Sequence, residues 1–317
     1  VRTRCPSNCT RLLSRKSSMP EKTIQVGIIG PAEQITQHLR VYATLAPVSV
    51  TGIVLTDGPS DACRDLVTQA PLRSTVAELL DSGKLDLVDV CIPAALNERW
   101  VWQIPRFRTP LLLTGPPANE AGALDGFLRR LKKSKSLAAA THTLRFASAW
   151  ARVKEIVESG VLGDALELEI TLADEAKRTP GGQSPTLFQA VDLACWLVER
   201  PPVGVQSSEP KGGFELAFPD DHSVRILPHH PVCTITVSGT TGALKGILPQ
   251  GDTSELQLSW PDRTKVLTVP PSDSLRNELA YYIGAMSRRE PWLIGSLADL
   301  QNSLLAFEMS RTCTPVS

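Results

Sequence analysis

The sequence contains no apolar run long enough to cross a bilayer. Its 317 residues are 42% hydrophobic, but runs such as 26–29 and 111–113 are far shorter than the ~20 residues that a spanning helix needs. An excess of charge of one sign is also missing, because 33 Lys and Arg balance 33 Asp and Glu. No sustained basic stripe is present that could neutralise a row of phosphates. The sequence therefore predicts no membrane and no nucleic acid among its partners.

Cysteine pairs at metal-ligand spacing are absent. The seven cysteines show no CxxC spacing, and Cys91, Cys195 and Cys233 lie in apolar runs where a small thiol packs well. Cys5 and Cys9 have no second pair to complete a zinc site. We therefore expect no metal site and reduced core cysteines, as in an intracellular, cytoplasmic protein.

Residues 1–18 contain no acidic residue. They carry five basic residues and several Ser and Thr before Met19. This composition is typical of a mitochondrial presequence, and it equally fits translated sequence upstream of a start at Met19. We exclude this tail from the fold as disordered or presequence-like. The protein would be mitochondrial only if the segment is a genuine presequence.

The first half alternates short β-rich runs with helix-length segments, which is typical of βαβ units. The first run is almost continuously apolar, as a strand covered on both faces should be, and Gly30 ends it. We predict an N-terminal Rossmann-type domain over residues 19–145, with a doubly wound parallel sheet of about six strands. The clearest strand candidates are 24–29, 48–55, 85–92, 111–113 and 137–140.

The second half, residues 146–317, alternates apolar and polar residues in its β-rich runs, which indicates strands with one wet face. We predict a C-terminal α+β domain with an open, largely antiparallel sheet. A helix at 185–198 should cover one face of that sheet, and the last helices, 274–286 and 296–310, should pack back toward the first domain. The free face predicts a homodimer through this sheet. The strand candidates are 165–172, 203–207, 214–218, 223–227, 232–238, 256–259 and 265–269.

The loop after the first strand is poor in the glycines that a dinucleotide site uses. A Gly-rich turn lets the backbone approach a diphosphate at a helix N-terminus. Gly30, Ala32 and Ile35 take the places of GxGxxG. Ala32 adds a methyl group where the diphosphate would approach, and Glu33 adds a like charge. The loop therefore indicates either a weakened nucleotide site or a structural turn that binds nothing.

Thr56 and Asp57 follow the second strand, where a Rossmann site often carries an acid for the ribose hydroxyls. Asp57 fits that role and, on charge grounds, favours NAD over NADP. It also fits the start of a turn with Gly58, because Asp is a favoured turn residue. Both interpretations stay open.

The order of several segments resembles the glucose-fructose oxidoreductase and inositol dehydrogenase family (Gfo/Idh/MocA) from about Ile24 to Thr312. The matching stretches are VGIIG, LDLVDVCIPAALN, LLLTGPPA, LRFASAWARVKEIVESGVLGDALELEI, QAVDLACWLVERPPV, SGTTGAL and ELAYYIGAMSRREPWLIGSLADLQNSLLAFEMS. The resemblance implies NAD or NADP as cofactor and a small-molecule ligand at the domain junction. The cofactor-binding candidates are Gly30, Ala32, Gln34, Thr56, Asp57, Pro93, Asn97, Thr114 and Gly115.

The proton-transfer groups implied by the resemblance are missing. Active members use a Lys and a His that stands one turn before an Asp, whereas this chain has Gly115 and Gln189 at those places and keeps Asp192. A glutamine amide can hydrogen-bond, but it cannot shuttle a proton at neutral pH. His142, close to the first-domain seam, is a replacement candidate, although a lone His beside a strand end also fits a hydrogen-bonded structural role. The catalytic candidates are thus Gln189, Asp192 and His142.

Three functions fit these residues. The first is a binding or regulatory protein that kept the fold and lost catalysis. The second is an NAD(P)-dependent oxidoreductase for a sugar, polyol or related small molecule, with an altered proton relay. The third is a non-redox enzyme that reuses the cleft. The fold by itself does not decide among them.

Overall fold

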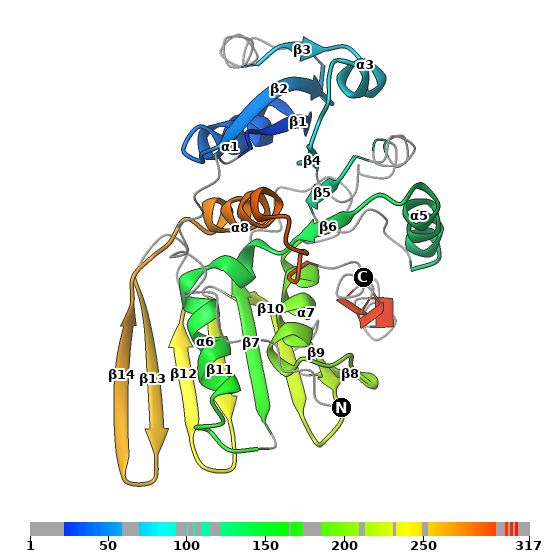
Figure 1. The fold of residues 1–317 in the computed structure, drawn as a ribbon. Coiled ribbons are helices and arrows are strands. Elements are labelled where there is room, and N and C mark those ends of the chain that lie inside the picture. The colour runs from blue at the N-terminus through cyan, green and yellow to red at the C-terminus, as the bar shows by residue number, and fades with distance from the viewer. Residues whose placement is uncertain are drawn as a thin grey trace.

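Two β-sheets of different construction organise the chain in a computed structural model (Figure 1). No helix among the described residues has the length and hydropathy of a membrane span. The structure describes residues 22–58, 70–92, 100, 104, 109–114, 121–164, 166–173, 185–208, 213–230, 233–248, 253–295, 302, 303, 305, 306, 308 and 309.

The first sheet has six parallel strands in the order β3-β2-β1-β4-β5-β6. Strands β2 and β3 are added on one side of β1 and strands β4 to β6 on the other, so the strand order reverses between β1 and β4, which is the switch point where doubly wound sheets bind ligands. The strands are β1 (Ile24–Gly30), β2 (Val48–Leu55), β3 (Leu72–Arg73), β4 (Leu87–Val90), β5 (Leu111–Thr114) and β6 (Ala138–Thr141).

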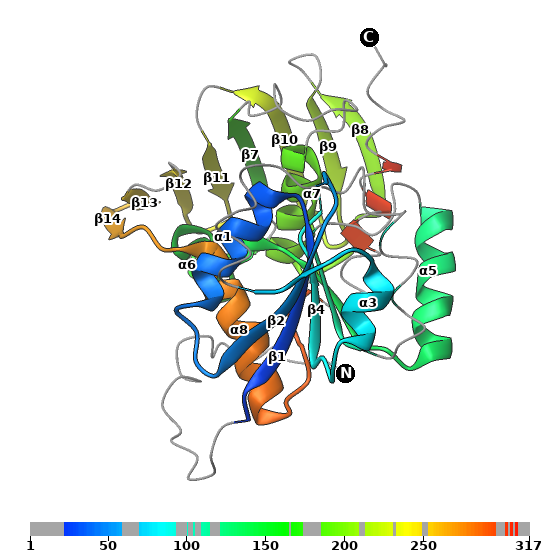
Figure 2. The ribbon, with the colours of Figure 1, turned by 90° about the horizontal axis from the view of Figure 1, so that it is seen from above.

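Helices cover both faces of this sheet (Figure 2). Val26 and Ile28 of β1 pack with the helices α1 (Ala32–Tyr42) and α8 (Ser274–Arg288), whereas Ile29 packs on the opposite side. That opposite side is covered by α3 (Val76–Asp81) and α5 (Ala121–Ser134). α8 therefore belongs to the core of the first sheet, as expected for the helix predicted at 274–286.

The second sheet has eight strands in the order β14-β13-β12-β11-β7-β10-β9-β8. β7 and β10 pair in parallel, and the other pairings are antiparallel. Helices α6 (Ser148–Glu158) and α7 (Pro185–Val198) cover one face. The strands are β7 (Glu167–Ala173), β8 (Gly204–Ser208), β9 (Gly213–Ala217), β10 (Ser223–His230), β11 (Thr234–Ser238), β12 (Ala243–Ile247), β13 (Ser254–Trp260) and β14 (Arg263–Val269).

The predicted fold class is confirmed: a doubly wound parallel sheet is followed by a largely antiparallel one. Two strands were not predicted. β3 has only two residues, and in β12 the alternation is hidden because Gly246 takes a buried position and Ile247 an exposed one. In the segment predicted as a helix at 296–310, residues 302, 303, 305, 306, 308 and 309 are helical, and the remaining positions lie outside the described residues.

The open face of the second sheet is mostly polar, and it also exposes the apolar side chains of Ile247 on β12 and Val266 on β14. One cross-strand row runs through side chains that are charged, amide or hydroxyl, and Nη1 of Arg225 donates to Oε2 of Glu169 at 3.4 Å. Because this row is polar, the face can be exposed to water without a second chain covering it. The row consists of Glu215, Arg225, Glu169, Thr236, Lys245 and Gln257.

The register of β12 gives a direct test of this arrangement. Leu244 is fully buried under the helices, whereas Ile247 on the same strand is 58% exposed on the open face. We expect Leu244→Ala to lower the free energy of unfolding by about 2–5 kcal/mol through a cavity. Ile247→Ala should change it by less than about 0.5 kcal/mol. Urea denaturation of both variants measures this, and equal costs would show that the register is wrong.

Candidate functional site

Four of the predicted site residues lie along one edge of the first sheet. Gly30 ends β1, Thr56 follows β2, Thr114 ends β5 and His142 follows β6. Because all six strands are parallel, these carboxyl ends meet at the same edge. The structure thus brings together the two ends of the predicted nucleotide site. Pro93, Asn97 and Gly115 lie outside the described residues.

Gly30 is fixed by packing between strands. A Cβ at this position would lie 2.5 Å from Sγ of Cys91 and 2.9 Å from its carbonyl oxygen. The N–H of Thr56 donates to the carbonyl of Gly30 at 3.0 Å, which ties the end of β2 to the end of β1. The close approach of β4 therefore explains this glycine without a ligand.

The carboxylate of Asp57 lies at the start of α1. Pro31 occupies the N-cap, and its side chain has no hydrogen-bond acceptor. Oδ2 of Asp57 accepts instead from the N–H of Ala32 at 3.2 Å, where the helix dipole stabilises an anion. The methyl group of Ala32 is buried, and Gln34 is half-buried in the same turn. One acidic side chain thus already occupies part of the anion-binding end of this helix.

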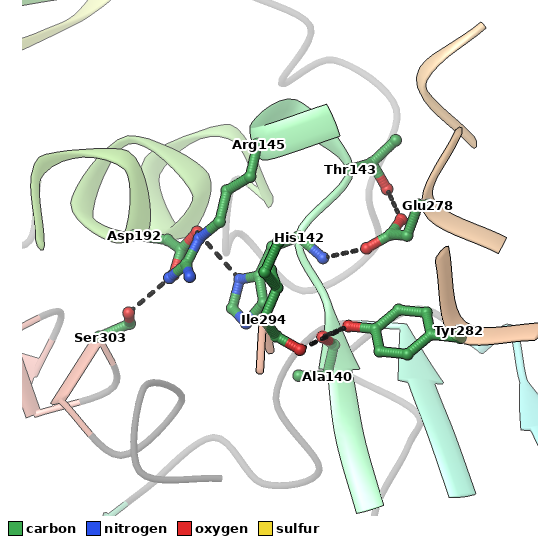
Figure 3. Close-up of polar contacts among 9 residues, drawn as sticks. All are labelled: Ala140, His142, Thr143, Arg145, Asp192, Glu278, Tyr282, Ile294 and Ser303. Carbon is green, nitrogen blue, oxygen red and sulfur yellow. Dashed lines mark hydrogen bonds and ion pairs between the residues drawn. The ribbon is translucent and has the colours of Figure 1, made fainter. Parts of the chain in front are cut away.

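A buried ion cluster lies at the junction of the two sheets (Figure 3). Asp192, on α7, accepts from Nε of Arg145 at 2.8 Å and from Nη2 at 2.5 Å. Oγ of Ser303 donates to Oδ1 of Asp192 at 2.8 Å, and Nδ1 of His142 lies 2.9 Å from Oδ2. Asp192 is 3% exposed. Arg145 belongs to η4 (Thr143–Phe146), the short 3₁₀ helix that follows β6.

Asp192 is held in its charged form. Burial by itself would raise the pKa of the Asp192 carboxyl, but His142 and Arg145 outweigh burial and hold this pKa well below its ordinary value. An ionised carboxylate can only accept hydrogen bonds. Asp192 therefore positions its neighbours and does not exchange a proton near neutral pH. Gln189, one turn earlier on α7, is half-buried.

His142 has one ring nitrogen engaged and one without a partner. Since Asp192 is an acceptor, Nδ1 of His142 must carry the proton between them. Nε2 has no hydrogen-bond partner among the described residues, although the side chain is 1% exposed. A buried nitrogen without a partner costs about 1–3 kcal/mol, and such atoms are rare in native proteins.

Glu278, which was not among the residues predicted from the sequence, holds the backbone beneath this cluster. Its carboxylate accepts from the N–H of His142 at 2.5 Å and from Oγ1 of Thr143 at 2.7 Å. Burial raises the pKa of Glu278 to about 7, although these two donors oppose the shift. Glu278 lies on the buried stripe of α8 with Leu279 and Tyr282. A lone acid at these positions of an apolar stripe was the signal that could have identified it.

A second buried polar group packs beside Glu278. Nδ1 of His38 lies 2.6 Å from Oδ2 of Asp89, and the hydroxyl of Tyr42 donates to the same oxygen at 2.8 Å. Burial lowers the pKa of His38, but Asp89 outweighs burial and raises it. His38 and Asp89 are the charged neighbours that act on Glu278. No group of three metal-ligating side chains occurs in the part of the chain that the structure describes.

The raised pKa of Glu278 predicts a pH-dependent stability. A carboxyl group with a raised folded-state pKa binds protons more tightly in the native state, so its contribution is full below about pH 4.5 and declines as the pH rises to about 7. The loss corresponds to about 3 kcal/mol. Glu278→Gln should reduce this slope, measured by urea denaturation between pH 5 and 8, and the raised pKa of His38 supplies the part that stays. Glu255→Gln, on the exposed face, should keep it; parallel curves for wild type and Glu278→Gln would contradict this assignment.

Removal of the Asp192 charge should be strongly destabilising. Asp192→Asn leaves Arg145 buried without its counter-ion, which costs about 3–5 kcal/mol. The exposed pair of Arg200 and Asp220 offers a control, since Asp220→Asn should cost less than about 1 kcal/mol. In the wild type the contribution of Asp192 is full above its ordinary pKa of 3.8 and is lost as the pH falls below it. Equal costs for the two variants in chemical denaturation would show that the cluster is not structural.

Comparisons with known proteins identify the fold. No protein-family model matches the sequence, and no curated protein matches it. Solved structures match over 92% of the chain. An aldose-aldose oxidoreductase from Caulobacter crescentus, complexed with glycerol, has a TM-score of 0.78 at 15% identity, with 97% of its length covered.

Two further solved structures carry nucleotides. An oxidoreductase from Agrobacterium radiobacter, in complex with NAD+, L-tartaric acid and magnesium, has a TM-score of 0.76 at 14% identity, with 96% of its length covered. A 3-ketoreductase from Actinomadura kijaniata, in complex with NADP and TDP-benzene, has a TM-score of 0.75 at 16% identity, with 98% covered. These neighbours are oxidoreductases of the Gfo/Idh/MocA type. The resemblance seen in the sequence is thus confirmed at the level of the fold, and the chain has the two-domain architecture of the Gfo/Idh/MocA-type oxidoreductases.

Proposed function

We propose that this chain binds an NAD(P)-type dinucleotide along the carboxyl edge of its first sheet and a small molecule beside it, and acts as a binding or regulatory protein without the proton relay that the family resemblance implies. The strand order and the gathering of Gly30, Thr56 and Thr114 at that edge support a nucleotide crevice. Solved neighbours with the same fold hold NAD+ or NADP.

At its two candidate positions, helix α7 presents no side chain that can transfer a proton near neutral pH. An alcohol or carbonyl substrate needs a group that takes or returns a proton. Gln189 is a neutral amide, and Asp192 is ionised and engaged with Arg145, His142 and Ser303. Gly115 has no side chain with which to replace the missing lysine. The groups implied by the resemblance therefore cannot support rapid hydride transfer.

The first test is a fluorescence titration with NADH and NADPH, followed by a turnover assay. We expect binding with dissociation constants of about 1 μM to 1 mM, the usual range for such ligands. We also expect no change in nicotinamide absorbance when NAD+ or NADP+ is mixed with sugars and polyols. Failure to bind either nucleotide would remove the cofactor from the proposal, and rapid turnover would remove the non-catalytic role.

Asp57 predicts which nucleotide binds better. Its carboxylate repels a 2′-phosphate and accepts from a ribose hydroxyl, so NADH should bind about tenfold or more tightly than NADPH. Asp57→Asn keeps an acceptor for the N–H of Ala32, because Asn is also a favoured N-cap, and removes the charge. In the variant, the ratio of the NADPH to the NADH dissociation constant should move closer to one. An unchanged ratio would mean that Asp57 only caps α1.

A second candidate function is an oxidoreductase with an altered proton relay. The observation that favours it is the imidazole of His142 at the junction, oriented by Asp192. A carboxylate that holds one ring nitrogen of a histidine is the arrangement that general bases use. Nicotinamide-dependent turnover that His142→Asn abolishes would favour this function over the first.

We also propose that the chain forms a homodimer through the open face of the second sheet. The middle of the face is a polar cross-strand row, so the interface would be largely hydrogen-bonded and charged, with Ile247 and Val266 as its apolar part. Light scattering at micromolar concentration tests the association. A monomeric mass would remove this proposal and leave the nucleotide site unaffected.

A further inference from the structure

The second ring nitrogen of His142 lies in a place where a ligand is the natural partner. The residue follows β6, at the carboxyl edge where parallel sheets bind ligands. The side chain is 1% exposed, and Nε2 has no hydrogen-bond partner within the described part of the chain. Buried polar atoms of this kind are explained by strain, by an ordered molecule or by a functional contact.

The surroundings hold the ring in one orientation. Asp192 fixes Nδ1, and the carboxylate of Glu278 fixes the backbone N–H of the same residue. Gly295 lies beside the ring, where a Cβ would come within 3.4 Å of Cδ2, the carbon bonded to Nε2. Figure 3 shows the ring between Asp192 and the segment that contains Ile294. The imidazole cannot turn toward another partner without breaking its bond to Asp192.

The charge balance indicates what kind of group Nε2 contacts. Arg145 and Asp192 neutralise each other, so this ion pair offers no net charge to attract an ion to Nε2. With a proton on Nδ1, an Nε2 atom that carries no proton presents a lone pair and therefore needs a donor. A hydroxyl group fits best, because it donates to the neutral ring and accepts from the protonated one.

The position in the sheet narrows the source of that hydroxyl. A dinucleotide bound at the switch point would span the crevice, with one half over β1 to β3 and the other over β4 to β6. Asp57 lies on the side that takes the adenosine half, and His142 lies at the end of the opposite edge strand. The hydroxyl therefore belongs to the nicotinamide half or to a small molecule beside it.

We propose that Nε2 of His142 accepts a hydrogen bond from a sugar-type hydroxyl at the carboxyl end of β6, which is either the ribose of the nicotinamide half or a polyol bound next to it. The inference rests on the proposed function, because it assumes that a nucleotide crevice forms at this edge. It assigns to His142 a direct ligand contact, and to Asp192 and Glu278 the role of positioning residues.

The test compares His142→Asn with a matched variant. An Asn amide keeps a donor near the place of Nδ1 for Asp192 and lacks the Nε2 nitrogen. His222→Asn is the control, since His222 accepts from the N–H of Leu166 at 2.9 Å within the second half and an Asn oxygen can replace that acceptor. Circular dichroism and thermal unfolding show whether each variant folds.

Three probes separate the two sources of the hydroxyl. AMP reports the adenosine half alone, NADH reports the whole dinucleotide, and myo-inositol with saturating NADH reports a polyol beside it. We expect His142→Asn to weaken the binding of either NADH or myo-inositol at least about tenfold. This is the loss of affinity expected when one hydrogen bond to a buried partner is removed. AMP binding should be unchanged, and His222→Asn should change none of the three. Loss of NADH binding assigns the ribose, and loss of myo-inositol alone assigns the polyol.

Other outcomes overturn the proposal or the function beneath it. A folded His142→Asn variant that binds NADH and myo-inositol as the wild type does would overturn the ligand contact and leave the proposed function standing. A wild type that binds no NADH overturns the dinucleotide function, and myo-inositol alone then decides the role of His142; binding of neither probe overturns both. If His142→Asn does not fold, the nitrogen NMR shift of Nε2 in the wild type decides, since the proposal requires it to move when NADH or myo-inositol is added.

Discussion

The buried carboxylate of Asp192 is the interaction on which the junction of the two sheets depends. Asp192 belongs to α7, the helix that covers the second sheet, whereas Arg145 and His142 follow the last strand of the first sheet. All three side chains are more than nine-tenths buried, so their charges and donors must be matched inside the protein. This cluster therefore fixes how the end of the first sheet meets the second layer, and with it the orientation of the imidazole.

The helix α8 extends this constraint into the first sheet. In sequence it lies far beyond the last parallel strand, yet it packs on β1 and α1. Its Glu278 binds the backbone at His142, and the hydroxyl of Tyr282 donates to the carbonyl of Ala140 at 3.2 Å. The protonation of the Glu278 carboxyl on α8 is therefore coupled to the backbone at the end of β6. The segment that carries the candidate ligand contact is thus held from both halves of the chain.

The same fold holds different local chemistry at its two ends. At the β1 end, Gly30 is needed for the close approach of β4, and Asp57 caps α1. Residues predicted at the nucleotide site therefore also stabilise the fold. At the β6 end, the groups that form a buried cluster are Arg145, Asp192 and His142. A shared architecture therefore does not by itself assign a reaction, because function depends on the site and not on the layers.

The sequence by itself determined the layers of this protein. Continuous apolar runs separated by helices predicted the parallel sheet, and alternating runs predicted the open antiparallel one, because hydrophobic periodicity is a local property of the chain. It also placed Asp192 and His142 among the candidates. Only the tertiary structure decided that these two residues meet, that Arg145 neutralises the carboxylate, and that Glu278 holds the backbone between them. Those contacts join residues 47 to 136 positions apart, and their strength comes from burial, which no local pattern encodes.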